Sequence, residues 1–367
     1  MNIISRKATD GMKKINLMAP INYLGYGIVG RHIFLELNKT ADVTLFPIGG
    51  PQETSQENIQ TIQSAVAKQN DIAKNCTAIK IWHEHSLAER PPCNKFIGFP
   101  IFELDTLHDR AISHMKSCDE IFVCSRWARD VVYDQFGVTG HAVNIIPLGV
   151  DRTIFHENYD DPENNKCRFF TCGKWEIRKG HDVLLKVFQT AFPNNEDVEL
   201  HMMCQNDFPQ AAKFVQQMQQ YYTSDPRVNL VPRVNTHQEV ALVMSQMDCG
   251  VFLSRAEGWN LELLEMMSMG KHVIATNYSA HTEFCDTNNC MLVDITDKEA
   301  AFDGVWFDGK IGKWAAIEEQ QIEQAASHMK SFYETWKTNK SQSNTVGIST
   351  AKEFNWEKTA SLILERV

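Results

Sequence analysis

Two glutamates in the stretch EGWNLELLE, Glu257 and Glu265, have the residue type and the spacing needed to hold the hydroxyl groups of a sugar. The stretch follows the apolar run CGVFLSR, so Glu257 is expected in a loop at the end of a strand. Asn260 is a favourable helix N-cap, and a helix N-terminus offers unpaired N–H groups to a phosphate. Glu265 then lies one turn inside the helix, where a carboxylate can accept two hydrogen bonds from a ribose diol. The alternative is a solvent-facing polar surface that Glu265 shares with Glu262.

A second group of charged residues lies in FTCGKWEIRKGHDVLL. An expected strand ends at Gly173, and Lys174, Arg178 and Lys179 precede a helix expected to begin at Gly180. Cations on a loop at the carboxyl end of a strand can clamp a diphosphate and neutralise the charge on a leaving nucleotide. The alternative is an exposed basic loop without a ligand.

Gly25, Gly27 and Gly30 in LGYGIVG have the spacing of a dinucleotide-binding turn. However, the next expected strand, DVTLFPIGG, ends without the acidic residue that such sites use to bind a ribose. We therefore expect a tight turn at which the backbone approaches a ligand, and no nicotinamide site.

His83 and His85 flank Glu84 at the end of the expected strand AIKIW. Two histidines at this spacing could bind zinc, but the sequence offers no third ligand near them, so we expect no metal site. The favoured interpretation is a histidine at a strand end that donates a hydrogen bond or moves a proton. A purely structural pair is the alternative.

The composition argues against several classes of protein. A formal net charge of −10, from 36 basic and 46 acidic residues, makes a nucleic-acid partner unlikely. Ten cysteines without a C-x-x-C pair indicate reduced, buried thiols in a cytoplasmic protein. The N-terminus lacks the apolar segment of a signal peptide, and no apolar run approaches the roughly 20 residues that cross a bilayer. We expect at most a peripheral association with a membrane.

The order of apolar and polar segments predicts two parallel α/β domains. The strands KINLMAP and DVTLFPI enclose a glycine turn and a helical pattern, which is the start of a βαβ unit. We expect a first domain over residues 1–160 and a polar linker at Asn158–Lys166. The alternation of strand and helix patterns restarts at RFFTCG, so we expect a second domain over residues 161–354 and a final amphipathic helix over 355–367. Two doubly wound domains leave a cleft between the carboxyl ends of their sheets, where ligands bind.

These segments, in this order, resemble family 4 of the nucleotide-sugar-dependent glycosyltransferases. The resemblance covers most of the chain and includes GYGIVG, DEIFVCSRWARDVV, NIIPLGVDRTIF and GKWEIRKGHDVLL. Its most specific part is SRAEGWNLELLEMMSMGKHVIAT, which is similar to the E-x7-E element of that family. The closing segment FNWEKTASLILERV is similar to the family's final helix, which crosses back to the first domain. The resemblance implies the GT-B fold, in which two Rossmann-like, doubly wound α/β domains face each other across a cleft.

The resemblance also implies a role for each candidate residue. Glu265 would hold the ribose of the donor nucleotide. Glu257 would act near the donor sugar as a catalytic residue, together with His83 or His85. The other expected donor-binding residues lie in the glycine turn, the basic loop and the E-x7-E element: Gly25, Gly27, Lys174, Lys179, Gly258, Asn260 and Leu261.

Two positions depart from the family pattern. Lys174 occupies the place of the usual arginine, so a point charge replaces a bidentate fork. The stretch NYSAHTEF carries Ser279, Ala280 and Glu283 where members usually have a Gly-Gly pair before a glutamate. Both departures bear on how tightly the donor is bound.

The activity implied by the resemblance is that of a retaining glycosyltransferase, which moves a sugar from a nucleotide-diphosphate donor to an acceptor hydroxyl. No essential metal and no cofactor are expected. The acceptor would be a carbohydrate or a lipid-linked sugar, bound mainly to the first domain. Domain closure would exclude water, so that the sugar is transferred and not hydrolysed. The two departures leave open an alternative, a non-catalytic partner subunit that binds a sugar nucleotide.

Overall fold

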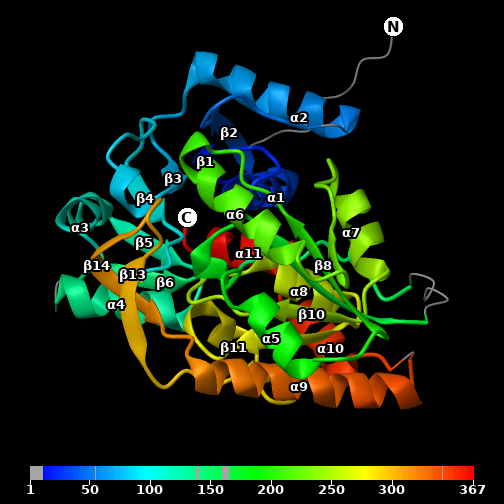
Figure 1. Cartoon of the computed structure of the whole chain (residues 1–367). Coiled ribbons are helices and arrows are strands. Elements are labelled where there is room, and N and C mark those ends of the chain that lie inside the picture. Colours follow the sequence, from blue (N-terminus) through cyan, green and yellow to red (C-terminus); the bar gives the residue numbers. More distant parts are fainter. Residues whose placement is uncertain (1–10, 54, 138–139, 159–164, 341) are drawn as a thin grey trace, which may run out of the picture.

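The computed structural model describes residues 11–53, 55–137, 140–158, 165–340 and 342–367. It contains two six-stranded parallel sheets with helices packed on them, and one separate antiparallel hairpin (Figure 1). The predicted architecture of two Rossmann-like, doubly wound α/β domains is therefore confirmed. None of the described helices is both long and apolar enough to span a bilayer.

The first domain holds the sheet β2-β1-β3-β4-β5-β6, in which every adjacent pair of strands is parallel. Its strands are nearly continuous apolar runs because helices cover both faces of a parallel sheet. On α1, Ile33, Phe34 and Leu37 are fully buried at helical spacing. The strands are β1 (Lys14–Ala19), β2 (Asp42–Pro47), β3 (Thr77–Ile81), β4 (Lys95–Phe99), β5 (Glu120–Val123) and β6 (Ala142–Ile145). The helices are α1 (Gly25–Thr40), α2 (Gln56–Ala67), α3 (Asp109–Lys116) and α4 (Arg126–Phe136).

The second domain holds the sheet β12-β11-β10-β7-β8-β9, again with parallel neighbours. Its strands are β7 (Cys167–Gly173), β8 (Val198–Cys204), β9 (Val228–Leu230), β10 (Cys249–Phe252), β11 (His272–Thr276) and β12 (Met291–Val293). Its helices are α5 (Leu184–Ala191), α6 (Ala212–Tyr222), α7 (His237–Ser245), α8 (Leu261–Ser268), α9 (Glu319–Thr338) and α10 (Thr345–Glu353). The helix expected at Gly180 begins only at Leu184, because a 3-10 turn over Ile177–Lys179 comes first. Most of the expected linker, residues 159–164, lies outside the described residues.

The last helix, α11 (Trp356–Leu364), packs against the first domain although it follows the second in sequence. The ring of Trp356 stacks on that of His32 in α1, with ring centres 4.9 Å apart. Thr359 Oγ1 donates a hydrogen bond to the Pro147 carbonyl at 2.8 Å. Asn355 caps the helix by accepting a hydrogen bond from the Lys358 N–H at 2.8 Å. The chain therefore crosses between the domains twice.

A hairpin of β13 (Lys298–Phe302) and β14 (Asp308–Ala315) forms its own small sheet. In Figure 1 this orange hairpin extends from the second domain alongside the cyan elements of the first. Asp105 of the first domain holds it, because the carboxylate accepts hydrogen bonds from Lys298 Nζ at 2.8 Å and from the Lys313 N–H at 2.7 Å. No pattern in the sequence predicted this hairpin.

Candidate functional site

The predicted site residues lie at the points where the strand order of each sheet reverses. In the first sheet this point lies between β1 and β3, and Gly25 follows β1 while His83 follows β3. In the second sheet it lies between β7 and β10, and Lys174 follows β7 while Glu257 follows β10. Ligands of open α/β sheets bind outside the carboxyl ends of the strands at such reversals. Gly25, His83, Lys174 and Glu257 thus follow the strands that flank these two reversals.

Glu257 is the centre of a buried ionic network. Its carboxylate accepts hydrogen bonds from Arg178 Nη1 at 2.9 Å, Lys179 Nζ at 3.0 Å and Ser254 Oγ at 2.7 Å. Burial raises the pKa of the Glu257 carboxyl, but the charges of Lys179 and Arg178 outweigh burial and hold that pKa well below its usual value. Glu257 is therefore ionised and firmly oriented.

The cations of the basic loop have different partners. Arg178 is buried, and besides Glu257 it donates to Glu176 Oε2 at 2.7 Å and to the Ala256 carbonyl at 2.8 Å. Its charge is therefore committed to carboxylates of its own domain. Among the three cations that the sequence placed in a diphosphate clamp, this leaves Lys174 and Lys179 as the candidates.

Lys174 rests on an aromatic pair at the domain junction. Its Nζ lies 5.0 Å from the ring centre of Phe208, within the range of a cation–π contact. The edge of Phe208 meets Trp306 of the hairpin, with ring centres 5.2 Å apart. Both rings are exposed, at 39% and 43% of their residue surface. Within the part of the chain that the structure describes, no carboxylate forms an ion pair with Lys174.

The start of α8 has the geometry of an N-capped helix. Asn260 Oδ1 accepts a hydrogen bond from the Leu263 N–H at 3.2 Å, so the predicted cap is confirmed. Asn260 adopts a left-handed conformation with φ of +83°. His281 supports it, because His281 Nε2 lies 2.9 Å from Asn260 Nδ2 and its Nδ1 lies 2.9 Å from the Thr276 carbonyl. Leu261, the first helical residue, is buried.

Glu265 is buried, with 7% of its surface exposed. The alternative of a solvent-facing helix surface is therefore wrong for this residue. Among the described residues, none makes a hydrogen bond to its carboxylate. Burial raises the pKa of Glu265 well above its usual value, and the negative charges of Glu262 and Asp151 raise it further. A buried acid without a partner is destabilising unless a ligand supplies hydrogen bonds to it.

The two histidines of the first domain have different surroundings. The His83 ring lies 4.8 Å from the rings of both Tyr26 and Trp82. Burial lowers the pKa of His83, and the charge of Lys174 in the second domain contributes in the same direction. His85 lies behind it, with Nδ1 3.1 Å from Glu84 Oε1, and this hydrogen bond raises the pKa of His85. The charge of Lys174 in the second domain thus affects the pKa of His83.

His108 lies near Glu84 and His85, which the sequence did not reveal. Each of the three residues offers one potential ligand atom, and these atoms lie within 4.8 Å of one another. However, His108 Nδ1 accepts a hydrogen bond from the Ala111 N–H at 3.2 Å, as the cap of α3. A neutral ring that accepts at Nδ1 carries its proton on Nε2 and has no lone pair left for a metal. His108 thus serves as a helix cap, and the absence of a metal site stays a prediction.

The predicted glycines differ in what they contact. A β-carbon on Gly27 would stand 2.0 Å from Asn22 Oδ1, so local packing of the turn already requires this glycine. Gly25 is exposed and has nothing within 4 Å of its β-carbon position, so its backbone is open to a ligand. On Gly258 a β-carbon would stand 2.4 Å from Ile101 Cγ2 of the first domain. Gly258 therefore marks a close contact between the two domains.

The residues that replace the family's Gly-Gly pair hold Glu257 in place. Ser279 has a φ of +52°, and its Oγ accepts a hydrogen bond from the Glu257 N–H at 2.8 Å. The Ala280 N–H donates to the Glu257 carbonyl at 3.2 Å. Glu283 reaches the first domain, where its Oε2 accepts from the Arg126 N–H at 2.8 Å. The departure thus supports the backbone of Glu257 from both sides.

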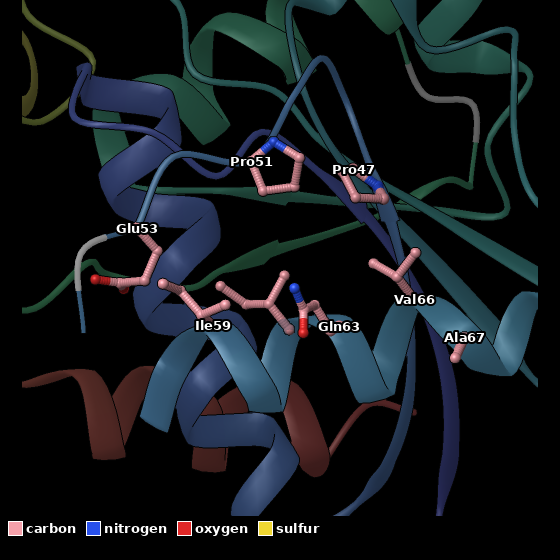
Figure 2. A pocket seen from close by; sticks show the side chains of 8 residues that line it. Pro47, Pro51, Glu53, Ile59, Gln63, Val66 and Ala67 are labelled. Atoms are coloured by element: carbon pink, nitrogen blue, oxygen red, sulfur yellow. The ribbon is translucent and has the colours of Figure 1, made fainter. Parts of the chain in front are cut away.

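A separate apolar pocket of about 540 Å³ lies between α2 and the loop after β2. Figure 2 shows Ile59, Gln63 and Val66 of α2 beside Pro47 and Pro51. None of the predicted site residues lines it.

Comparisons with known proteins agree with the fold. Residues 166–305 match the family model described as Glycosyl transferases group 1. A sequence comparison with curated proteins finds no match.

Among solved structures, the chain is similar to sucrose-phosphate synthase from Thermosynechococcus elongatus, with a TM-score of 0.66 and 14% identity over 96% of this chain and 98% of that one. It is similar to a glycosyltransferase from Rickettsia africae, with a TM-score of 0.67 and 12% identity over 97% and 98%. It is also similar to an E. coli structure described as trehalose-6-phosphate bound with UDP-2-fluoro glucose, with a TM-score of 0.69 and 8% identity over 96% and 98%. The chain has the GT-B fold of these structures, and its second domain matches Glycosyl transferases group 1.

Proposed function

We propose that the chain is a retaining glycosyltransferase of family 4, which uses a nucleotide-diphosphate sugar and needs no essential metal or cofactor. One observation carries the proposal. Lys174, Lys179 and Glu257 come from the strand-order reversal of the second sheet, and His83 comes from that of the first. The match of residues 166–305 to Glycosyl transferases group 1 covers the three second-domain residues.

The donor would bind mainly to the second domain. Its diphosphate would accept hydrogen bonds from Lys174 and Lys179 and from the N–H groups at the start of α8. Lys179, which donates a hydrogen bond to Glu257, would then be shared between Glu257 and the phosphate. The ribose diol would donate to Glu265, whose buried carboxylate has no hydrogen-bond partner among the described residues.

In the transfer step, the bond between the anomeric carbon and the diphosphate oxygen breaks, and the acceptor oxygen bonds to the same face of that carbon. The acceptor proton passes to the leaving diphosphate. Lys174 and Lys179 stabilise the negative charge that develops on that group. Glu257 and His83 bind hydroxyl groups of the donor sugar and so orient its anomeric carbon toward the acceptor.

A thermal-shift screen of nucleotide sugars with different bases tests the donor part, because a bound donor raises the unfolding temperature by mass action. We expect one nucleotide sugar to shift the midpoint at concentrations well above its Kd. Proton NMR of the product then reports whether the anomeric configuration is retained, and EDTA should leave the rate unchanged. The proposal fails if no nucleotide sugar shifts the midpoint.

The second candidate is a non-catalytic subunit that binds a sugar nucleotide. It is favoured by Lys174 in place of arginine and by Ser279 in a left-handed conformation where glycine is usual. Saturable donor binding without transfer or slow donor hydrolysis, across a broad acceptor panel, would support this candidate over the enzyme.

A further inference from the structure

Glu103 is a carboxylate of the first domain that the mechanism above does not use. It lies in the loop between β4 and α3, at the carboxyl edge of the first sheet. Its side chain keeps 31% of its surface exposed, and its Oε1 lies 4.0 Å from Arg178 Nη2 of the second domain. Among the described residues, no group donates a hydrogen bond to this carboxylate. Glu103 is therefore open to a ligand at the junction of the domains.

Arg178 does not neutralise Glu103. The guanidinium already donates to Glu176, to Glu257 and to the Ala256 carbonyl, at 2.7–2.9 Å. Burial raises the pKa of Glu103 to about 7; Arg178 opposes this change, while Glu257 and Glu176 add to it. The surroundings of Glu103 are thus acidic overall, although one cation is near.

The backbone on both sides of Glu103 is held in place. Tyr26 Oη donates to the Ile101 carbonyl at 2.5 Å and accepts from the Ile101 N–H at 3.1 Å. Asp105 is bonded to Lys298 and Lys313 of the hairpin, as described above. A carboxylate on a supported loop, with a long ion pair to Arg178 but no hydrogen-bond donor among the described residues, has the features of a preorganised binding group.

The neighbours of Glu103 suit a sugar with free hydroxyl groups. Tyr26 lies close to the loop of Glu103, because its hydroxyl is hydrogen-bonded to the Ile101 backbone. Burial raises the pKa of that hydroxyl, and the charges of Glu84 and Glu103 raise it further. Tyr26 and Trp82 pack together with ring centres 5.3 Å apart. Aromatic faces with a few polar groups are typical of small-molecule sites. A phosphate or carboxylate at this place would be repelled by Glu103 when that carboxyl is ionised, whereas a hydroxyl would donate a hydrogen bond to Glu103.

We propose that Glu103 binds a hydroxyl group of the acceptor, and that the acceptor is an uncharged, unphosphorylated carbohydrate where it meets this residue. The inference rests on the proposed function, and it adds an acceptor-binding residue and a substrate class to it. Glu84 follows β3 at the same edge of the first sheet, and its hydrogen bond with His85 lowers the pKa of Glu84 against the effect of burial.

The test uses the full chain with the nucleotide sugar that gives the largest thermal shift. Transfer is measured to matched acceptors, such as N-acetylglucosamine and glucose and the 6-phosphate of each. The variants are Glu103→Ala and Glu103→Gln, and the control is Glu89→Gln, which changes an exposed glutamate of the same domain. The Kd of the donor is measured for every variant by calorimetry.

We expect transfer to the unphosphorylated sugars only. Glu103→Ala should raise the acceptor KM by about 10-fold or more, as for loss of a charge-assisted hydrogen bond, with Glu103→Gln intermediate. The donor Kd should change by no more than about twofold, because the donor binds mainly to the second domain and Glu103 belongs to the first. Transfer to the phosphorylated sugars, no transfer to any neutral sugar, or an unchanged acceptor KM would overturn the inference. An equal loss of donor affinity would also overturn it, since Glu103 would then belong to the donor site. If the unmodified chain binds no nucleotide sugar, the proposed function itself is refuted.

Discussion

Gly258 and Ile101 belong to different domains, yet a β-carbon on Gly258 would stand 2.4 Å from Ile101 Cγ2 and 3.2 Å from the Phe102 carbonyl oxygen. Real β-carbons almost never approach other atoms so closely. The contact lies directly beside Glu257. The two domains can approach this closely next to the candidate catalytic residue because residue 258 is a glycine and has no side chain.

Gly258→Ala should therefore hold the domains apart and lower transfer by about 10-fold or more, because small displacements of reacting groups are costly. Overpacking of this kind costs about 1–3 kcal/mol. Adding Ile101→Ala should restore much of the rate, since it removes the clashing methyl group. Gly50→Ala is the control, because nothing lies within 4 Å of the β-carbon position at Gly50. Full activity of the single Gly258→Ala variant would show that the closed contact is not needed for transfer.

The sequence predicted those parts of the site that depend on local pattern. The strand ends at Gly173 and before Glu257 are visible as apolar runs, and Asn260 is a recognisable cap. Burial of Glu265 could not be predicted, because helical spacing alone does not tell which side of α8 faces the protein. Glu265 is covered only after α8 packs on its neighbours in the second domain and beside Asp151, more than 100 residues away in the chain.

Glu265→Gln should weaken donor binding by about 10-fold or more while stabilising the fold at alkaline pH. The pKa of Glu265 is raised in the folded state, so between the unfolded pKa and the folded one the native state binds more protons. Wild-type stability therefore falls as pH rises through that interval, and the glutamine variant lacks this loss. We expect a higher unfolding temperature for Glu265→Gln at pH 8, by roughly 2–4 °C per kcal/mol gained, and little difference near pH 4.5.

Calorimetric titration of the donor and thermal unfolding at both pH values check the two halves of this prediction. Glu323→Gln, in α9, provides a carboxylate-to-amide control away from the site. A Glu265→Gln variant that binds the donor as tightly as wild type would remove Glu265 from the donor site, whatever its stability.

Lys174→Arg should tighten donor binding by about 2- to 10-fold, because an arginine fork can make two parallel hydrogen bonds to a phosphate. Lys174 Nζ lies 5.0 Å from the centre of the Phe208 ring, and an arginine can stack on the same ring. Lys174→Ala should weaken binding by about 10-fold. Lys186→Ala, in an exposed ion pair with Glu319, is the control. Equal Kd values for wild type and Lys174→Ala would contradict a role in diphosphate binding.

The hairpin and Glu103 show what local sequence patterns cannot reveal. The hairpin strands are mostly exposed, so they lack the apolar runs that marked the other strands. Glu103 and Arg178 are 75 positions apart in the chain, and only the packing of the two domains brings them to 4.0 Å. Both features are properties of the domain junction, which the pattern of either domain alone does not specify.

His181 should make the second domain sensitive to acid. It is fully buried, and burial, together with the charges of Lys179 and Arg178, lowers its pKa to about 3. The unfolded state binds a proton below about pH 6.5 and the native state does not, so stability falls as pH decreases from 6.5 toward 3. The loss is about 1.4 kcal/mol per pH unit, or about 2 kcal/mol between pH 6.5 and 5.

Urea unfolding at pH 7 and pH 5 should therefore show a smaller pH-dependent loss for His181→Gln than for wild type. His328→Gln, on α9, should lose as much as wild type. An equal loss for wild type and His181→Gln would mean that another group causes the acid sensitivity.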